Sequence, residues 1–410
     1  MEALDEHDQV ANSKWVHLEK IYKIMRAFIL FNLTLATSAL AGTSNGDFVE
    51  DLGSNSIAYD SNADESDGGT QLSVTDFTLD ADLLISDDIN VQRYSATLGL
   101  EYGDTTLDLS YNQVNYDLDV AGEAINPTNR DDRTDLYSLT LGQKWNDRVS
   151  SSLALSGYEG FTSHRSIWIT ETFDQTSRGA PGFQEADPSG FSVGLTNTFT
   201  LPNDFDTISW SIGYSRDQIA PGQTISFDPL TGFFGVLPTD DVLETFSTSL
   251  TGNFYVTNKV TSQLFLRASQ VTDREVRGQV RLNTAWSITQ GLTLRGEIGT
   301  TFESPDFDSL YGGLTLTYQL LDSLSATVGY RLYSDSGEIT TSNFNSSAPE
   351  FDSSEISASL LWNSGPHSAS LSAAFLETDL GDINPASARF EGLFTDRNFF
   401  AVRAAYTLKF

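Results

Sequence analysis

The sequence predicts an all-β fold: a transmembrane antiparallel up-and-down β-barrel of about 16 strands, with roughly 14–18 compatible with the pattern. Three observations predict it. Apolar residues recur with period 2 in segments of about ten residues. The connections between these segments are mostly short and long in alternation. After the N-terminal region, no apolar run reaches the roughly 18 residues that a helical span needs.

The alternation is clearest in the last segment, residues 398–410. Its polar face carries Arg403, Thr407 and Lys409. Its apolar face carries Phe400, Val402, Ala404, Tyr406, Leu408 and Phe410. Successive side chains of a strand point to opposite faces, so one face of this segment suits lipid and the other suits water.

The same pattern recurs along the chain and defines the expected strands. They are 70–84, 91–102, 104–116, 134–145, 149–160, 189–201, 207–216, 243–256, 260–271, 275–288, 292–303, 309–320, 324–334, 353–363, 367–378 and 398–410. The first is the weakest, because Asp76, Asp80 and Asp82 interrupt its apolar pattern. The connections expected to be long are 117–133, 161–188, 217–242, 335–352 and 379–397. Short turns on one rim and long loops on the other are typical of transmembrane barrels.

Residues 1–41 are expected to be a signal peptide, because a basic start precedes a short apolar core at 27–36 and an Ala39-Leu40-Ala41 cleavage site. Met25 is an alternative initiator, which would make 1–24 an over-called start. The alternative is a membrane anchor, which the apolar core of only about ten residues disfavours, since a span needs roughly 20. Residues 42–69 then form an acidic, flexible periplasmic segment, and 70–410 form the barrel.

Composition excludes several functions. With 23 Lys and Arg against 56 Asp and Glu, the formal charge of −33 argues against a nucleic-acid partner. The absence of Cys excludes thiolate catalysis and Cys-ligated metals, and the four His residues are far apart. Residues 60–71 resemble a calcium loop, but Glu65 and Gln71 replace the required Gly and Glu. We expect no metal and no cofactor.

No catalytic constellation is evident either. His164 lies in a long loop beside Arg165, and no Ser-His-Asp order accompanies it. A barrel hydrolase would need a His near Asp or Ser at the rim. We therefore do not expect an enzyme.

The C-terminal pattern of Tyr406, Leu408 and Phe410 resembles the sorting signal of Gram-negative outer-membrane β-barrel proteins, and the chain as a whole resembles a porin-like member of that class. The resemblance covers nearly all of 70–410 as a pattern and includes no specific motif. It implies a location in the cell outer membrane, contact with outer-membrane lipid, and recognition by the barrel-assembly machinery. Porins of this size are often trimers, so the resemblance leaves a homotrimer open.

Charged residues on the polar faces are the candidate pore lining. They are Arg267, Arg277, Arg281, Arg295, Glu297, Arg331 and Arg403. Avoidance of lipid alone would turn these charges inward. It would not explain why the strands are rich in Arg while most Asp and Glu lie in the expected loops and in 47–67. We therefore predict an Arg-rich lumen wall that acts on charged solutes.

Segment 161–188 is the longest connection, and it would be the third outer loop. In the porins that the chain resembles, this loop folds into the pore. Its acids are the candidate constriction residues Glu171, Asp174, Glu185 and Asp187, which would face the Arg wall. The alternative is an external loop with solvated charges, since only Pro181-Gly182-Phe183 approaches the usual loop motif.

Strand number points to function, because about 16–18 strands leave an aqueous channel whereas eight are filled by side chains. The sequence therefore predicts a porin-like channel for passive diffusion of small hydrophilic solutes. One alternative is a structural or surface-interaction barrel with a closed lumen and partner-binding acidic outer loops. A second is a transporter for hydrophobic substrates, which would need an apolar path or a lateral gap.

Overall fold

The computed structural model describes residues 72–122, 125–161, 167, 171, 188–203, 205–218, 222–228, 233–239, 242–271, 275–303, 307–336, 350–381 and 395–410. The predicted signal peptide, the acidic segment 42–69 and His164 lie outside these residues. Within them, no helix is long and apolar enough to cross a membrane.

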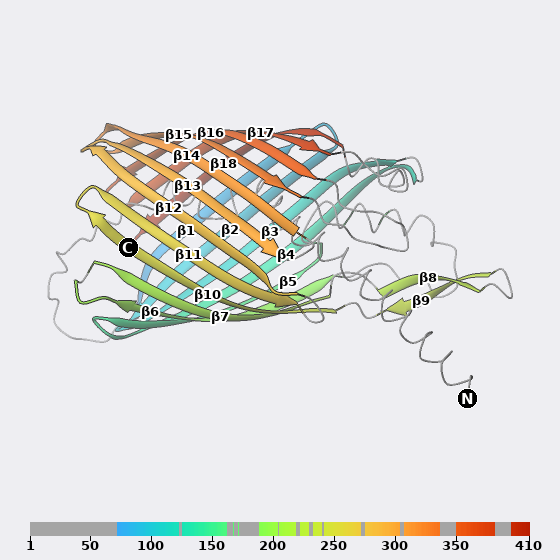
Figure 1. Cartoon of the computed structure of the whole chain (residues 1–410), viewed down its shortest axis with the longest axis horizontal. Coiled ribbons are helices and arrows are strands. Elements are labelled where there is room, and N and C mark those ends of the chain that lie inside the picture. The colour runs from blue at the N-terminus through green and yellow to red at the C-terminus, as the bar shows by residue number, and fades with distance from the viewer. Residues whose placement is uncertain are drawn as a thin grey trace.

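The described strands form a closed barrel of sixteen, in which each strand pairs antiparallel with its neighbours (Figure 1). The barrel strands are β1 (Ser73–Ile85), β2 (Ile89–Tyr102), β3 (Thr105–Gly122), β4 (Ile125–Asn146), β5 (Val149–Glu159), β6 (Ser189–Thr200), β7 (Thr207–Gln218), β10 (Val242–Thr257), β11 (Val260–Val271), β12 (Arg277–Thr289), β13 (Leu292–Glu303), β14 (Phe307–Leu321), β15 (Leu324–Asp335), β16 (Phe351–Ser364), β17 (His367–Leu380) and β18 (Arg397–Lys409). The predicted all-β up-and-down barrel is confirmed.

The first and last strands close the barrel. β1 pairs with β18 in continuous register from Asp76 opposite Lys409 to Ile85 opposite Phe400. A closed sheet leaves no edge strand, so its backbone N–H and C=O groups are paired within the wall and can lie in lipid.

The strand least certain from sequence is regular in the structure. Asp76, Asp80 and Asp82 occupy alternate positions of β1, whereas Leu79 and Leu83 occupy the other face. The acids interrupt no apolar face, because they belong to the opposite one. On β18, Tyr406 and Leu408 lie opposite Leu79 and Phe77, and therefore on the outward face. Their role in sorting stays a prediction.

Two connections expected to be loops contain strands. Most of 117–133 belongs to β3 and β4, which stay paired until Gly122 opposite Ile125. The period-2 pattern continues through Tyr116 and Leu118, and both side chains are buried, which explains the longer hairpin. Segment 217–242 contains β8 (Gly222–Asp228) and β9 (Phe233–Thr239), a separate two-stranded sheet.

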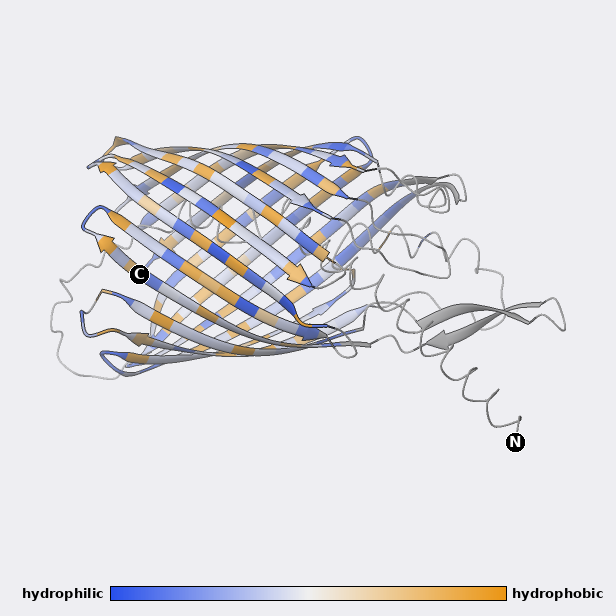
Figure 2. Cartoon of the chain, viewed as in Figure 1, coloured by the Kyte–Doolittle hydropathy of each residue, from blue (hydrophilic) through white to orange (hydrophobic). Residues whose placement is uncertain are grey.

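Hydrophobic and hydrophilic residues alternate along the barrel strands (Figure 2), and large apolar side chains are exposed on the outward face. Leu314, Ile356 and Leu371 are more than half exposed on this face, as lipid contact requires. Aromatic residues near the strand ends are also exposed, and they are Tyr94, Tyr102, Trp145, Phe199, Trp286, Phe302, Trp362 and Phe375. An apolar band between aromatic girdles is the exterior of a membrane-spanning barrel.

The two rims differ as the sequence predicted. At one rim, tight turns such as Gly103-Asp104 and Gly365-Pro366 join the strands. Gly103 and Gly365 have φ of 58° and 59°, a left-handed conformation that favours glycine. The strand ends that flank the longest connection, Glu159 of β5 and Ser189 of β6, pair at the opposite rim, which we call the outer rim.

Candidate functional site: the barrel lumen

The register decides which side chains face the lumen, because directly paired residues share one face of a sheet. The predicted lining residues Arg267, Arg277, Arg281, Arg295, Glu297, Arg331 and Arg403 all occupy the face opposite to the exposed Leu and aromatic residues. Their contribution to transport stays a prediction.

The predicted Arg wall on β11–β15 is not uniformly basic. Arg277 Nη2 lies 2.7 Å from Glu303 Oε2, and both side chains are buried. Arg331 lies directly opposite Glu355 of β16, which is buried. Asp335 also lies on this lumen face. The lumen face thus also holds Glu303, Asp335 and Glu355, which were not among the predicted lining residues. The same two-residue period, followed along β13, β15 and β16, places them there.

Aromatic rings fix two of these arginines. The Arg277 guanidinium carbon lies 4.5 Å from the ring centroid of Phe307, and that of Arg281 lies 5.1 Å from Phe265. A guanidinium over an aromatic face gains cation–π energy and loses rotamer freedom. These arginines are therefore packed into the wall.

A different surface covers β5, β6, β7 and β10, and we call it the hydroxyl sector. Its lumen positions are mainly Ser and Thr, and neighbouring strands share hydrogen bonds between their hydroxyls. The Oγ atoms of Ser156 and Ser192 are 2.7 Å apart, and those of Ser211 and Ser249 are 2.7 Å apart. Within its described lumen positions, the charged residue is Asp217 near the outer rim, which accepts a hydrogen bond from Tyr158.

Two arginines join the closing strands. Arg403 of β18 donates to Asp80 of β1, and its Nε lies 3.5 Å from Asp82 Oδ1. Nearer the outer rim, Arg397 Nη2 lies 2.6 Å from Asp88 Oδ2, in the β1–β2 turn. Arg403 therefore faces the lumen as predicted, but it is engaged with acids of the neighbouring strand.

An apolar cluster fills the lumen side of β1–β3 near the outer rim. Its buried members include Ile89, Val91 and Leu118, together with Phe161 and Ile167 from the start of the long connection after β5. The Thr134 hydroxyl donates to the Phe161 carbonyl. These contacts place the beginning of that connection against the inside of the barrel.

Glu171, a predicted constriction residue, pairs with an arginine of β4. It is completely buried, and its Oε2 lies 2.6 Å from Arg130 Nη1. Its contribution to a constriction stays a prediction. Asp174, Glu185 and Asp187 lie outside the described residues.

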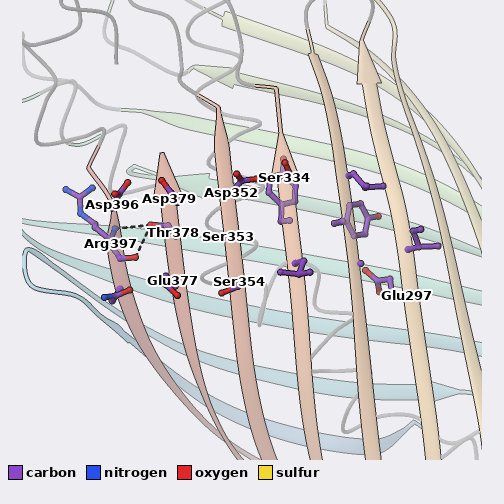
Figure 3. A pocket seen from close by; sticks show the side chains of 17 residues that line it. Glu297, Ser334, Asp352, Ser353, Ser354, Glu377, Thr378, Asp379, Asp396 and Arg397 are labelled. Carbon is purple, nitrogen blue, oxygen red and sulfur yellow. Dashed lines mark hydrogen bonds between the residues drawn. The ribbon is translucent and has the colours of Figure 1, made fainter. Parts of the chain in front are cut away.

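The outer ends of β16 and β17 carry polar residues on both faces. A hollow of about 790 Å³ lies at the outer ends of β13–β18, and its lining includes Asp352, Ser354, Glu377 and Asp379 together with lumen-facing residues such as Ser353 and Thr378 (Figure 3). By register these four residues face outward, above Ile356 and Phe375. The change from apolar to acidic side chains marks the outer limit of the hydrocarbon-facing band.

No protein-family model matches the sequence, and no curated protein matches it. Among solved structures, the chain is similar to the CymD monoaromatic hydrocarbon channel, with 9% identity, a TM-score of 0.42, and coverage of 82% of this chain and 89% of that one. A mutant ferric enterobactin receptor (PfeA) from Pseudomonas aeruginosa gives 10% identity, a TM-score of 0.43, and coverage of 84% and 81%. A bacterial polysaccharide outer membrane secretin has 8% sequence identity and a TM-score of 0.45, and the match covers 84% of this chain and 100% of that one. At these identities the similarity concerns the barrel fold alone.

The location follows from the barrel itself. A closed antiparallel barrel satisfies its own backbone, its exterior is apolar between aromatic girdles, and its interior is polar. This combination is the architecture of outer-membrane proteins and places the chain in an outer membrane.

Proposed function

We propose that the protein is an outer-membrane channel through which small hydrophilic solutes diffuse passively. The observation that carries the proposal is the polar lumen face of a sixteen-strand barrel, in which the hydroxyl sector lies beside the charged residues of β11–β16. Barrels of about this strand number enclose an aqueous channel.

Water access to the lumen face supports an open path. Thr106 and Asp108 of β3 and Arg267 of β11 face the lumen, and all three are exposed. Charged and hydroxyl groups on such a surface hydrogen-bond to water or to a polar solute at little cost, whereas an apolar solute gains nothing from them. The transporter for hydrophobic substrates is correspondingly disfavoured, because the apolar lumen residues near the outer rim are buried in packed clusters.

A specific observation favours the second candidate, a closed surface-interaction barrel. Phe161, Ile167 and Glu171 lie inside the outer end of the barrel, and the ion pairs of Arg277 and Arg403 cross-link lumen side chains. A lumen filled in this way would leave the acidic outer loops as the functional surface.

Single-channel recording in a planar bilayer with a salt gradient separates the two candidates. A diffusion channel gives a steady, salt-dependent conductance from purified, folded, heat-modifiable protein. Folded protein without conductance would refute the proposal and favour the closed barrel. Topology is tested on intact cells, where protease should cut within 161–188 or 217–242. Cleavage confined to the 364–366 turn would invert the assigned orientation.

A further inference from the structure

Arg267 differs from the other arginines predicted to line the lumen. It lies directly opposite Ser249 of β10 and Gln279 of β12, so its neighbours across the sheet are uncharged. Within the part of the chain that the structure describes, no carboxylate forms an ion pair with it. Arg277 and Arg403, by contrast, bond to Glu303 and to Asp80.

Exposure separates Arg267 in the same way. Arg277 and Arg281 are less than a tenth exposed, and both stack on aromatic rings. Arg267 is exposed, yet its register directs it into the barrel interior, so the water that reaches it is lumen water. It is a fixed positive charge available to whatever occupies the lumen at this level.

The surroundings of Arg267 supply a second kind of recognition. It stands at the border of the hydroxyl sector, where Ser249 bonds to Ser211 and the next lumen position of β10 toward the outer rim is Ser247. Hydroxyls both donate and accept hydrogen bonds, and they exchange bound water for solute hydroxyls without net loss. A guanidinium pairs well with the two oxygens of a carboxylate or with a phosphate.

We propose that Arg267, with the bordering Ser249 and Gln279, forms a subsite for small hydroxylated anions inside the lumen. The carboxylate or phosphate of the solute would lie on the guanidinium, and its hydroxyl groups along the hydroxyl sector. This inference rests on the proposed channel function, since the solute must enter the lumen. The proposed subsite differs from the Arg-rich wall predicted from the sequence, because a single cation, Arg267, provides the preference for anions.

The chain contains no Cys, so a Ser249→Cys variant carries a single thiol opposite Arg267. We would compare its modification rates with an anionic sulfonate and a cationic trimethylammonium thiol reagent of similar size. A positive unit charge about 7 Å away in water raises the rate of the anionic reagent and lowers that of the cationic reagent, each by about threefold. Arg267→Gln should therefore lower the ratio of the anionic to the cationic modification rate by about sevenfold to tenfold.

Two further variants control for charge and folding. Arg267→Lys keeps the charge and should keep most of the ratio. Arg133→Gln removes a cation from the outward face, where Arg133 pairs with Asp135, and should leave the ratio unchanged. An unchanged ratio in folded Arg267→Gln would overturn the inference, as would a Ser249→Cys thiol that neither reagent modifies.

The solute itself is probed with gluconate and sorbitol, which share a hydroxylated chain and differ in the carboxylate. Gluconate should reduce the salt conductance of the wild-type channel more than sorbitol does. That difference should fall by about threefold to fivefold in Arg267→Gln, the range of an exposed ion pair. Conductance that distinguishes neither solute refutes the subsite and leaves the channel standing. If the thiol is modified but the protein gives no conductance, the proposed channel function is refuted. The ratio of the two modification rates still shows whether Arg267 favours anions.

Discussion

The ion pairs at the junction of β18 and β1 give a sharp test of how the barrel is held closed. Asp80 and Asp82 are 9% and 8% exposed, and Arg403 contacts both. Arg403→Gln removes the cation and leaves two carboxylates side by side on the lumen face. Asp80 loses the cation that it bonds, and the two carboxylates repel one another.

The magnitude follows from burial. Removing one partner of a buried ion pair costs about 3–5 kcal/mol, because the remaining charge stays desolvated. The Arg403 side chain is 16% exposed and borders a polar lumen. We therefore expect the lower end, about 3 kcal/mol, which is roughly a hundredfold in the unfolding equilibrium constant. The variant should unfold at a lower urea concentration in lipid vesicles, measured by tryptophan fluorescence and by heat-modifiable migration.

Two controls separate the charge effect from a packing effect. The triple change Arg403→Gln, Asp80→Asn and Asp82→Asn should restore most of the lost stability, because it removes the two carboxylates that Arg403 neutralises together with Arg403 itself. Lys409→Gln removes an exposed cation from the lumen face of the same strand and should change little. A single variant as stable as wild type, or a triple variant as unstable as the single one, would refute the reasoning.

Three further predictions concern other parts of the barrel. Glu303→Gln should lower the free energy of unfolding by about 3–5 kcal/mol, because Arg277 is buried against Glu303. Adding Arg277→Gln should restore most of this stability, whereas additive losses of stability in urea titrations would show that the pair is not coupled. Glu171→Gln should speed trypsin cleavage at Arg165 and Arg178 by up to about tenfold, because the buried Glu171 carboxylate bonds to Arg130. The control Glu159→Gln changes an exposed carboxylate and should leave the cleavage rate unchanged, and equal cleavage rates for Glu171→Gln and wild type would contradict the anchoring. Leu314→Arg should lower the folding free energy gained in vesicles by about 2–4 kcal/mol, because Leu314 faces outward and is 60% exposed. Ser247→Arg on the lumen face should be tolerated, and an equal loss of stability in both variants would mean that the assigned faces are wrong.

The period-2 pattern was sufficient to predict the barrel and most strand bounds. The segments 149–160, 260–271 and 292–303 agree with β5, β11 and β13 to within one residue. Alternation is a local property, and a lipid exterior enforces it on every strand. The same pattern gave the inward direction of Arg267 and Arg281, because a one-residue shift would place them in lipid.

The pairing of the lumen charges was not predictable in this way. Glu303 and Arg277 are 26 positions apart, and they meet only because β12 and β13 pair in one particular register. Glu171 meets Arg130 across 41 positions, from a connection that has no periodicity to read. Sequence alternation gives the face of a residue, whereas its partner depends on the shear between strands.

This difference changes how the lumen charges act on a solute. Counting Arg residues on inward faces suggests a strongly basic wall, but a cation bonded to a carboxylate a few ångströms away presents a dipole, whose field falls off faster than that of a single charge. Water and salt in a channel screen what remains within about 10 Å. A solute passing at that distance responds mainly to unpaired, exposed charges. In the proposed channel, selectivity would be set by charges that strand register leaves without a partner, which is why Arg267 rather than the full set of arginines is the residue to test.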